Sequence, residues 1–205
     1  MVREHNTRFQ KFLAGLGKRL FWWRQKKVNG LFMCLSFLED LRVLVELNDG
    51  NVEAALRDFR DIGNVAGHDL LYEMLDVGKM IFSKSLADMP LFIRVSWYVL
   101  MGEDLPEKNI KYFPKGTENN EYDMCVFTFD QCLFCAGLHE EKELVINAET
   151  VGEQSYGSVV AGVLEAAIQT IMDYVENDYT VKVKETKCIM KGDLHPEFTM
   201  WFIPK

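Results

Sequence analysis

The sequence predicts an α+β fold in which two antiparallel hairpins, joined by a long helix, form a sheet covered by helices on one face. Three observations support this prediction. Apolar residues recur with a helical period from about 156 to 175, two-residue alternation lies on either side of that stretch, and the first half of the chain has helical periodicity. A chain of 205 residues can bury a core without metal or disulfides.

Four helices are expected before the first strand. Their ranges are 7–27, 31–47, 52–75 and 91–101. Gly30 separates the first two, and Asn51 is placed to act as the N-cap of the third. A fifth helix begins near Tyr156 and stops near Asn177.

Four strands follow from alternating apolar and polar residues. The first pair is expected at 109–113 and 121–129, around a turn rich in Pro, Gly and Asn, and the second at 179–184 and 195–203. We expect Gly192 and Asp193 to form a two-residue turn, which would pair Cys188 with Glu197.

The first residues form a basic extension, and we divide the chain into an extension (1–30) and one domain (31–205). Residues 1–27 hold eight Lys or Arg and one acidic residue, whereas the remainder holds 15 basic and 30 acidic residues. The basic amphipathic helix is expected to dock on the body or on a partner subunit, and contact with a membrane surface through 7–27 stays open. The acidic body argues against nucleic acid as a partner.

The remaining bulk properties concern location. No apolar run approaches the roughly 18 residues that span a bilayer, and no signal peptide opens the sequence. Five cysteines cannot all pair with one another, so we read a reducing setting. The expectation is a soluble cytoplasmic protein.

Several short motifs resemble the signature of the 4-vinyl reductase domain. They are Gly162-Val-Leu-Glu165, Glu185-Thr-Lys-Cys188, Gly192-Asp193 and Glu197-Phe198, together with Ile62–Gly67 and Cys132–Cys135, which resemble archaeal members. The resemblance implies the ligand-binding fold of TRAPP vesicle-tethering subunits and haem-NO sensors. It also implies a cavity between the helices and the sheet that takes a hydrocarbon, lipid tail or tetrapyrrole.

We assign eight residues to the lining of that cavity because they are apolar, aromatic or small and lie on the elements that would enclose it. They are Gly63, Gly67, Trp97, Phe134, Tyr156, Val160, Gly162 and Val163. Close packing between two helices is the alternative for the glycines, and it stays open.

A zinc site is the second candidate. Cys132 and Cys135 have the two-residue spacing of a metal half-site, and the expected hairpin turn places Cys188 and His195 on one sheet face. The resemblance adds Glu185 as a ligand. Free thiols and a redox pair remain alternatives.

The function we expect is a non-catalytic module, forming a homodimer, that binds or senses a small apolar ligand. No phosphate-binding glycine loop, G-x-G-x-x-G, G-x-S-x-G or His-Glu-x-x-His motif is present, which lowers the expectation of an enzyme. Two alternatives are kept. One is a reductase or auxiliary protein acting on a vinyl-bearing tetrapyrrole, and the other is a scaffold subunit of the TRAPP type.

Overall fold

The computed structural model describes residues 30–78, 82–101, 104–130 and 153–205. The expected N-terminal helix at 7–27 lies outside these residues. The division into an extension and a domain therefore stays a prediction.

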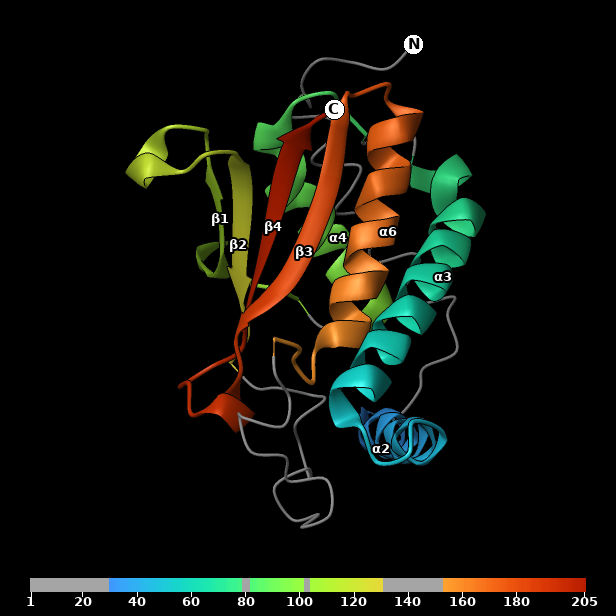
Figure 1. Ribbon diagram of the computed structural model, residues 1–205. Helices are drawn as coiled ribbons and strands as arrows, with labels where there is room; N and C mark the ends of the chain where they lie inside the picture. The colour runs from blue at the N-terminus through green and yellow to red at the C-terminus, as the bar shows by residue number, and fades with distance from the viewer. Residues whose placement is uncertain (1–29, 79–81, 102–103, 131–152) are drawn as a thin grey trace.

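A four-stranded antiparallel sheet forms the centre of the fold, in the order β1-β2-β4-β3 (Figure 1). The strands are β1 (Ile110–Phe113), β2 (Asp123–Thr128), β3 (Tyr179–Lys187) and β4 (Glu197–Pro204). β2 and β4 are central, so the two predicted hairpins join through their later strands. The α+β prediction is confirmed.

One face of the sheet is apolar and carries the core. Its buried side chains come from alternating positions of the three longer strands: Cys125, Phe127, Val181, Val183, Phe198, Met200 and Phe202. The opposite face carries Lys182 and Lys184, which are exposed. The two-residue alternation from which the strands were predicted therefore separates a buried face from an exposed one.

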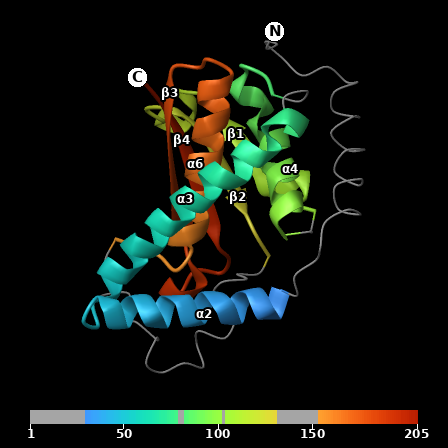
Figure 2. The same ribbon diagram turned by 90° about the vertical axis from the view of Figure 1, so that its right-hand side faces the viewer.

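Helices cover the inner face in two layers (Figure 1). α6 (Ser158–Tyr174) lies against the sheet, with α4 (Met89–Met101) beside it, and α3 (Val52–Gly78) packs on α6. α2 (Gly30–Leu47) packs on α3 in turn, and Figure 2 shows it running beneath the other helices. Among the described helices, none is long and apolar enough to cross a membrane.

Local signals set several helix ends as predicted. The Oδ1 atom of Asn51 accepts a hydrogen bond from the Ala54 amide at 3.1 Å, which confirms the N-cap of α3. Before it, Asp49 and Gly50 adopt positive φ angles of 52° and 83° and end α2. Short 3-10 turns complete the chain at Leu86–Asp88, Glu107–Asn109, Thr117–Asn119 and Ile189–Lys191.

The predicted turn between β3 and β4 is wrong. Lys187, not Cys188, pairs with Glu197, and Cys188 lies beyond the end of β3. The chain turns through a 3-10 segment that closes at Gly192, whose φ is 93°. A β-bulge between Glu185 and Lys187 shifts the register, so the two-residue turn that we expected does not fit.

Candidate functional site

The edge of the sheet along β3 is covered by polar side chains from the helices. Glu165 of α6 accepts hydrogen bonds from the Val183 amide at 2.8 Å and from Arg60 of α3 at 2.7 Å. Arg60 also donates to the Val183 carbonyl at 2.8 Å. Gln169 accepts from the Val181 amide at 2.8 Å. These contacts satisfy backbone groups that an edge strand would otherwise expose.

Glu185 lies on the inner face of β3 and reaches the start of α6. Its Oε2 atom accepts a hydrogen bond from the Gly157 amide at 3.0 Å, so a strand residue supplies the cap that Gly157 lacks. A Cβ atom on Gly157 would lie 2.7 Å from the Phe198 ring and 2.8 Å from the Glu185 carboxylate carbon, so a larger residue would require these side chains to shift.

Burial raises the pKa of Glu185, and it outweighs the polar contacts from Ser155, Gly157 and Cys188 that favour the ionised form. The carboxylate is only 4% exposed. Its Oε1 atom has no hydrogen-bond partner of good geometry among the described residues. A buried carboxylate oxygen in this state can accept a donor or ligate a cation.

The structure brings together two of the five predicted zinc ligands. Cys188 is buried and lies beside Glu185, whereas His195 is exposed in the β3–β4 connection. Cys132 and Cys135 lie outside the described residues. Within the part of the chain that the structure describes, no three His, Cys, Asp or Glu side chains cluster in a way that could hold a metal ion.

The three glycines assigned to the cavity lie instead in the contact between α3 and α6. A Cβ atom on Gly63 would clash with the backbone of Val159, and one on Gly67 would clash with that of Val163. A Cβ atom on Gly162 would likewise meet the backbone of Arg60. Close helix packing, the alternative for these residues, is what the structure shows. Because each glycine faces backbone, none faces an open cavity.

The other cavity residues lie in or beside the core. Trp97 of α4 stacks on Phe129 with ring centroids 3.9 Å apart, and Tyr156 and Val160 are buried near the start of α6. Val163 is half-buried, and Phe134 lies outside the described residues. Trp97 belongs to an aromatic cluster between α4 and the sheet, whose other members are Phe127, Phe129 and Phe198.

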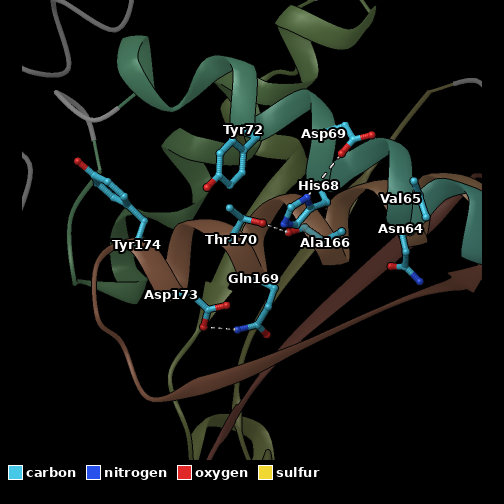
Figure 3. Close-up of a pocket in the computed structure, with 10 residues that line it drawn as sticks. All are labelled: Asn64, Val65, His68, Asp69, Tyr72, Ala166, Gln169, Thr170, Asp173 and Tyr174. Atoms are coloured by element: carbon cyan, nitrogen blue, oxygen red, sulfur yellow. Dashed lines mark hydrogen bonds and ion pairs between the residues drawn. The ribbon is translucent and has the colours of Figure 1, made fainter.

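A groove of about 730 Å³ lies between α3 and α6 (Figure 3). From α3, the ring of Tyr72 stacks on His68 at 5.6 Å, and Val65 is 65% exposed. From α6, Tyr174 and Asp173 border it. The complete lining is Asn64, Val65, His68, Asp69, Tyr72, Ala166, Gln169, Thr170, Asp173 and Tyr174.

Sequence reasoning missed this groove. Val65 and Tyr72 of α3 line it and are exposed, and neither was predicted to belong to a site. Apolar side chains on the polar side of an amphipathic helix were the available signal.

Comparison with solved structures gives a match in overall fold. The chain superposes on a trafficking protein particle complex subunit 3 from Naegleria fowleri, covalently bound to palmitic acid, with a TM-score of 0.58 and 16% sequence identity. The alignment covers 86% of this chain and 96% of that one. The fold is that of a TRAPP subunit.

The TRAPP-type fold agrees with the relationship that the sequence motifs implied. No family model matches the sequence, and no curated protein matches it either. The fold is therefore supported by structure, whereas the resemblance to the 4-vinyl reductase domain has no support beyond the motifs. In the structure those motifs have local roles: Glu165 covers the β3 edge, Glu185 caps α6, and Gly192 closes the turn.

Proposed function

We propose that the chain is a non-catalytic module that binds one apolar, chain-like ligand. The similarity in fold to a TRAPP subunit that holds palmitic acid is the observation that carries this proposal. The aromatic cluster of Trp97, Phe127, Phe129 and Phe198 supports it, because stacked rings between a helix and a sheet provide an apolar contact surface with few polar groups.

The test is titration of the purified chain with a fluorescent sixteen-carbon fatty acid, followed by displacement with palmitic acid. We expect saturable binding that Trp97→Ala weakens about tenfold or more. Trp201→Ala is the matched control. Trp201 lies between the buried Met200 and Phe202 on β4, so its side chain is on the other face of the sheet, away from the aromatic cluster. Thermal melting shows whether each variant is folded. The absence of saturable binding by the wild type would refute the proposal.

A scaffold role is the second candidate function. The relative is a subunit of a complex, and α2 leaves Val43 and Leu47 53% and 75% exposed. We propose a homodimer that uses this surface of α2. Native mass spectrometry should show a dimer that becomes a monomer in Val43→Glu/Leu47→Glu, and a wild-type monomer would exclude it.

Zinc is a further proposal, with Cys132, Cys135, Cys188, His195 and Glu185 as its ligands. The neighbouring Glu185 and Cys188 fit a metal, because both are buried and Glu185 Oε1 lacks a well-placed partner in the described structure. A bound ion would link Cys132 and Cys135 to the β3–β4 hairpin and so stabilise the fold. Elemental analysis after metal-replete expression should give about one zinc per chain, and a value below about a tenth would refute the site.

No specific observation favours the alternative of a reductase or auxiliary protein that acts on a vinyl-bearing tetrapyrrole. A cytoplasmic location remains part of the proposal, and it is supported by Cys125 and Cys188, which are buried and form no disulfide.

A further inference from the structure

The groove between α3 and α6 is bordered by exposed apolar side chains and by two carboxylates. Val65, Tyr72 and Tyr174 are 65%, 67% and 41% exposed, and Ile62, one turn before Val65 on α3, is 51% exposed. Val65, Tyr72 and Tyr174 line one groove, and exposed apolar side chains that gather in this way are usually covered by a partner.

Acidic side chains predominate around the groove. Asp69 and Asp173 line it, and no Lys or Arg is among its described lining residues. α3 as a whole carries six acidic residues and two arginines. Both arginines already have partners: Arg57 pairs with Glu53, and Arg60 with Glu165. Lys205 contacts Asp173, but both side chains are about half exposed, so that pair is weak in water.

A segment of the same chain has the complementary character. Residues 7–27 hold seven Lys or Arg and no acidic residue, and their sequence predicts an amphipathic helix. The apolar stripe of that helix consists of Phe9, Phe12, Leu13, Leu16 and Leu20. A helix of this length spans about 31 Å, enough to cover the roughly 12 Å between positions 64 and 72 of α3.

We propose that residues 7–27 dock in the α3–α6 groove of their own molecule. Only residues 28 and 29 separate the segment from the start of α2 at Gly30. Figure 2 shows α2 and α3 diverging from the turn that joins them, so that the N-terminal end of α2 and the C-terminal half of α3 lie on the same side. A tethered segment meets such a site at a high effective concentration, which favours docking within one chain.

The experiment is photo-crosslinking in the full-length chain. p-Benzoylphenylalanine is placed at Tyr72, inside the groove, or at Leu194, which is 93% exposed in the β3–β4 connection and serves as the control. Mass spectrometry of the digested products identifies the attachment sites. We expect the Tyr72 probe to attach to residues 7–27 at least about tenfold more often than the Leu194 probe. Attachment elsewhere, or equal frequencies from both probes, would overturn the proposal.

Two further experiments test whether the docked segment belongs to the same molecule and whether charge contributes to its docking. An equal mixture of ¹⁴N- and ¹⁵N-labelled chains should give crosslinks of unmixed isotope, and mixed crosslinks would instead assign the groove to a second copy. Asp69→Lys/Asp173→Lys should reduce crosslinking about three- to tenfold, whereas Glu121→Lys, in the β1–β2 loop, should not.

Thermal melting checks the fold of each charge variant. If the double variant does not fold, Lys18→Glu/Arg19→Glu in the segment makes the same test from the other side. Crosslinking that is insensitive to both charge changes would overturn the electrostatic basis of the docking.

Discussion

Glu165 of α6 and Val183 of β3 are joined by a 2.8 Å hydrogen bond that ties a helix to the open edge of the sheet. The same carboxylate oxygen accepts from Arg60, so three elements meet at one side chain that is only 13% exposed. An edge strand closed by side chains in this way cannot readily pair with another strand.

Glu165→Ala should therefore destabilise the fold by about 2–4 kcal/mol, because it leaves the Val183 amide and the Arg60 guanidinium without their acceptor in a partly buried place. Glu53→Ala is the matched control, since Glu53 pairs with Arg57 on an exposed part of α3 and its loss should cost less than about 1 kcal/mol. Denaturant unfolding measures both, and equal losses would contradict the argument.

Gly162→Ala should destabilise the protein, although alanine normally stabilises a helix by up to about 1 kcal/mol relative to glycine. The added Cβ would meet the backbone of Arg60, which cannot move without separating α3 from α6. We expect a loss of about 1–3 kcal/mol or more by chemical denaturation. A stabilised variant would show that space remains beside Gly162, as the cavity hypothesis required.

Cys125 should make the stability of the fold fall at alkaline pH. Burial raises the pKa of its thiol from 9.0 to about 12, so between these values the unfolded chain loses a proton that the folded chain keeps. Stability from this group is present below pH 9 and is lost as pH rises, by at most about 1.4 kcal/mol per pH unit.

Unfolding free energies at pH 8, 9 and 10 for the wild type and for Cys125→Ala measure this effect. The variant has a lower stability overall, but its slope above pH 9 should be shallower than that of the wild type. Parallel slopes would mean that the thiol ionises with equal ease in the folded chain.

Gly192→Ala should cost about 1–2 kcal/mol through the backbone alone. Its φ of 93° is unfavourable for a residue with a Cβ, yet no atom lies within 4 Å of the added carbon. Leu194→Ala, two residues away and 93% exposed, should change stability by less than about 0.5 kcal/mol. Thermal unfolding separates the two, and a neutral Gly192→Ala would argue that the turn adopts another conformation.

Local patterns were sufficient for the elements that have a single periodicity. The stripe on α6 and the alternation of Phe198, Met200 and Phe202 gave the helix, the strand and their buried faces, because burial on one side imposes a period of 3.6 or of 2. Asn51 gave the start of α3 for the same local reason, since a cap bonds only to the next few amides.

The candidate sites depended on contacts that no local pattern contains. In the sequence, the three glycines fit either the lining of a cavity or close helix packing. Only the position of α3 against α6 in the folded chain shows that they allow close packing. The place of Cys188 depended on a bulge in β3, and one residue of register changes which side chains share a sheet face.

By itself, the sequence determined the fold class and the order of the described helices and strands, because the periodic patterns that predict them lie within short stretches of the chain. The tertiary structure alone decided that Glu165 closes the β3 edge, that Glu185 caps α6 and that Val65 and Tyr72 border a groove. Each of these relationships joins residues far apart in sequence, and their distances are set only when the helices pack on one another and on the sheet.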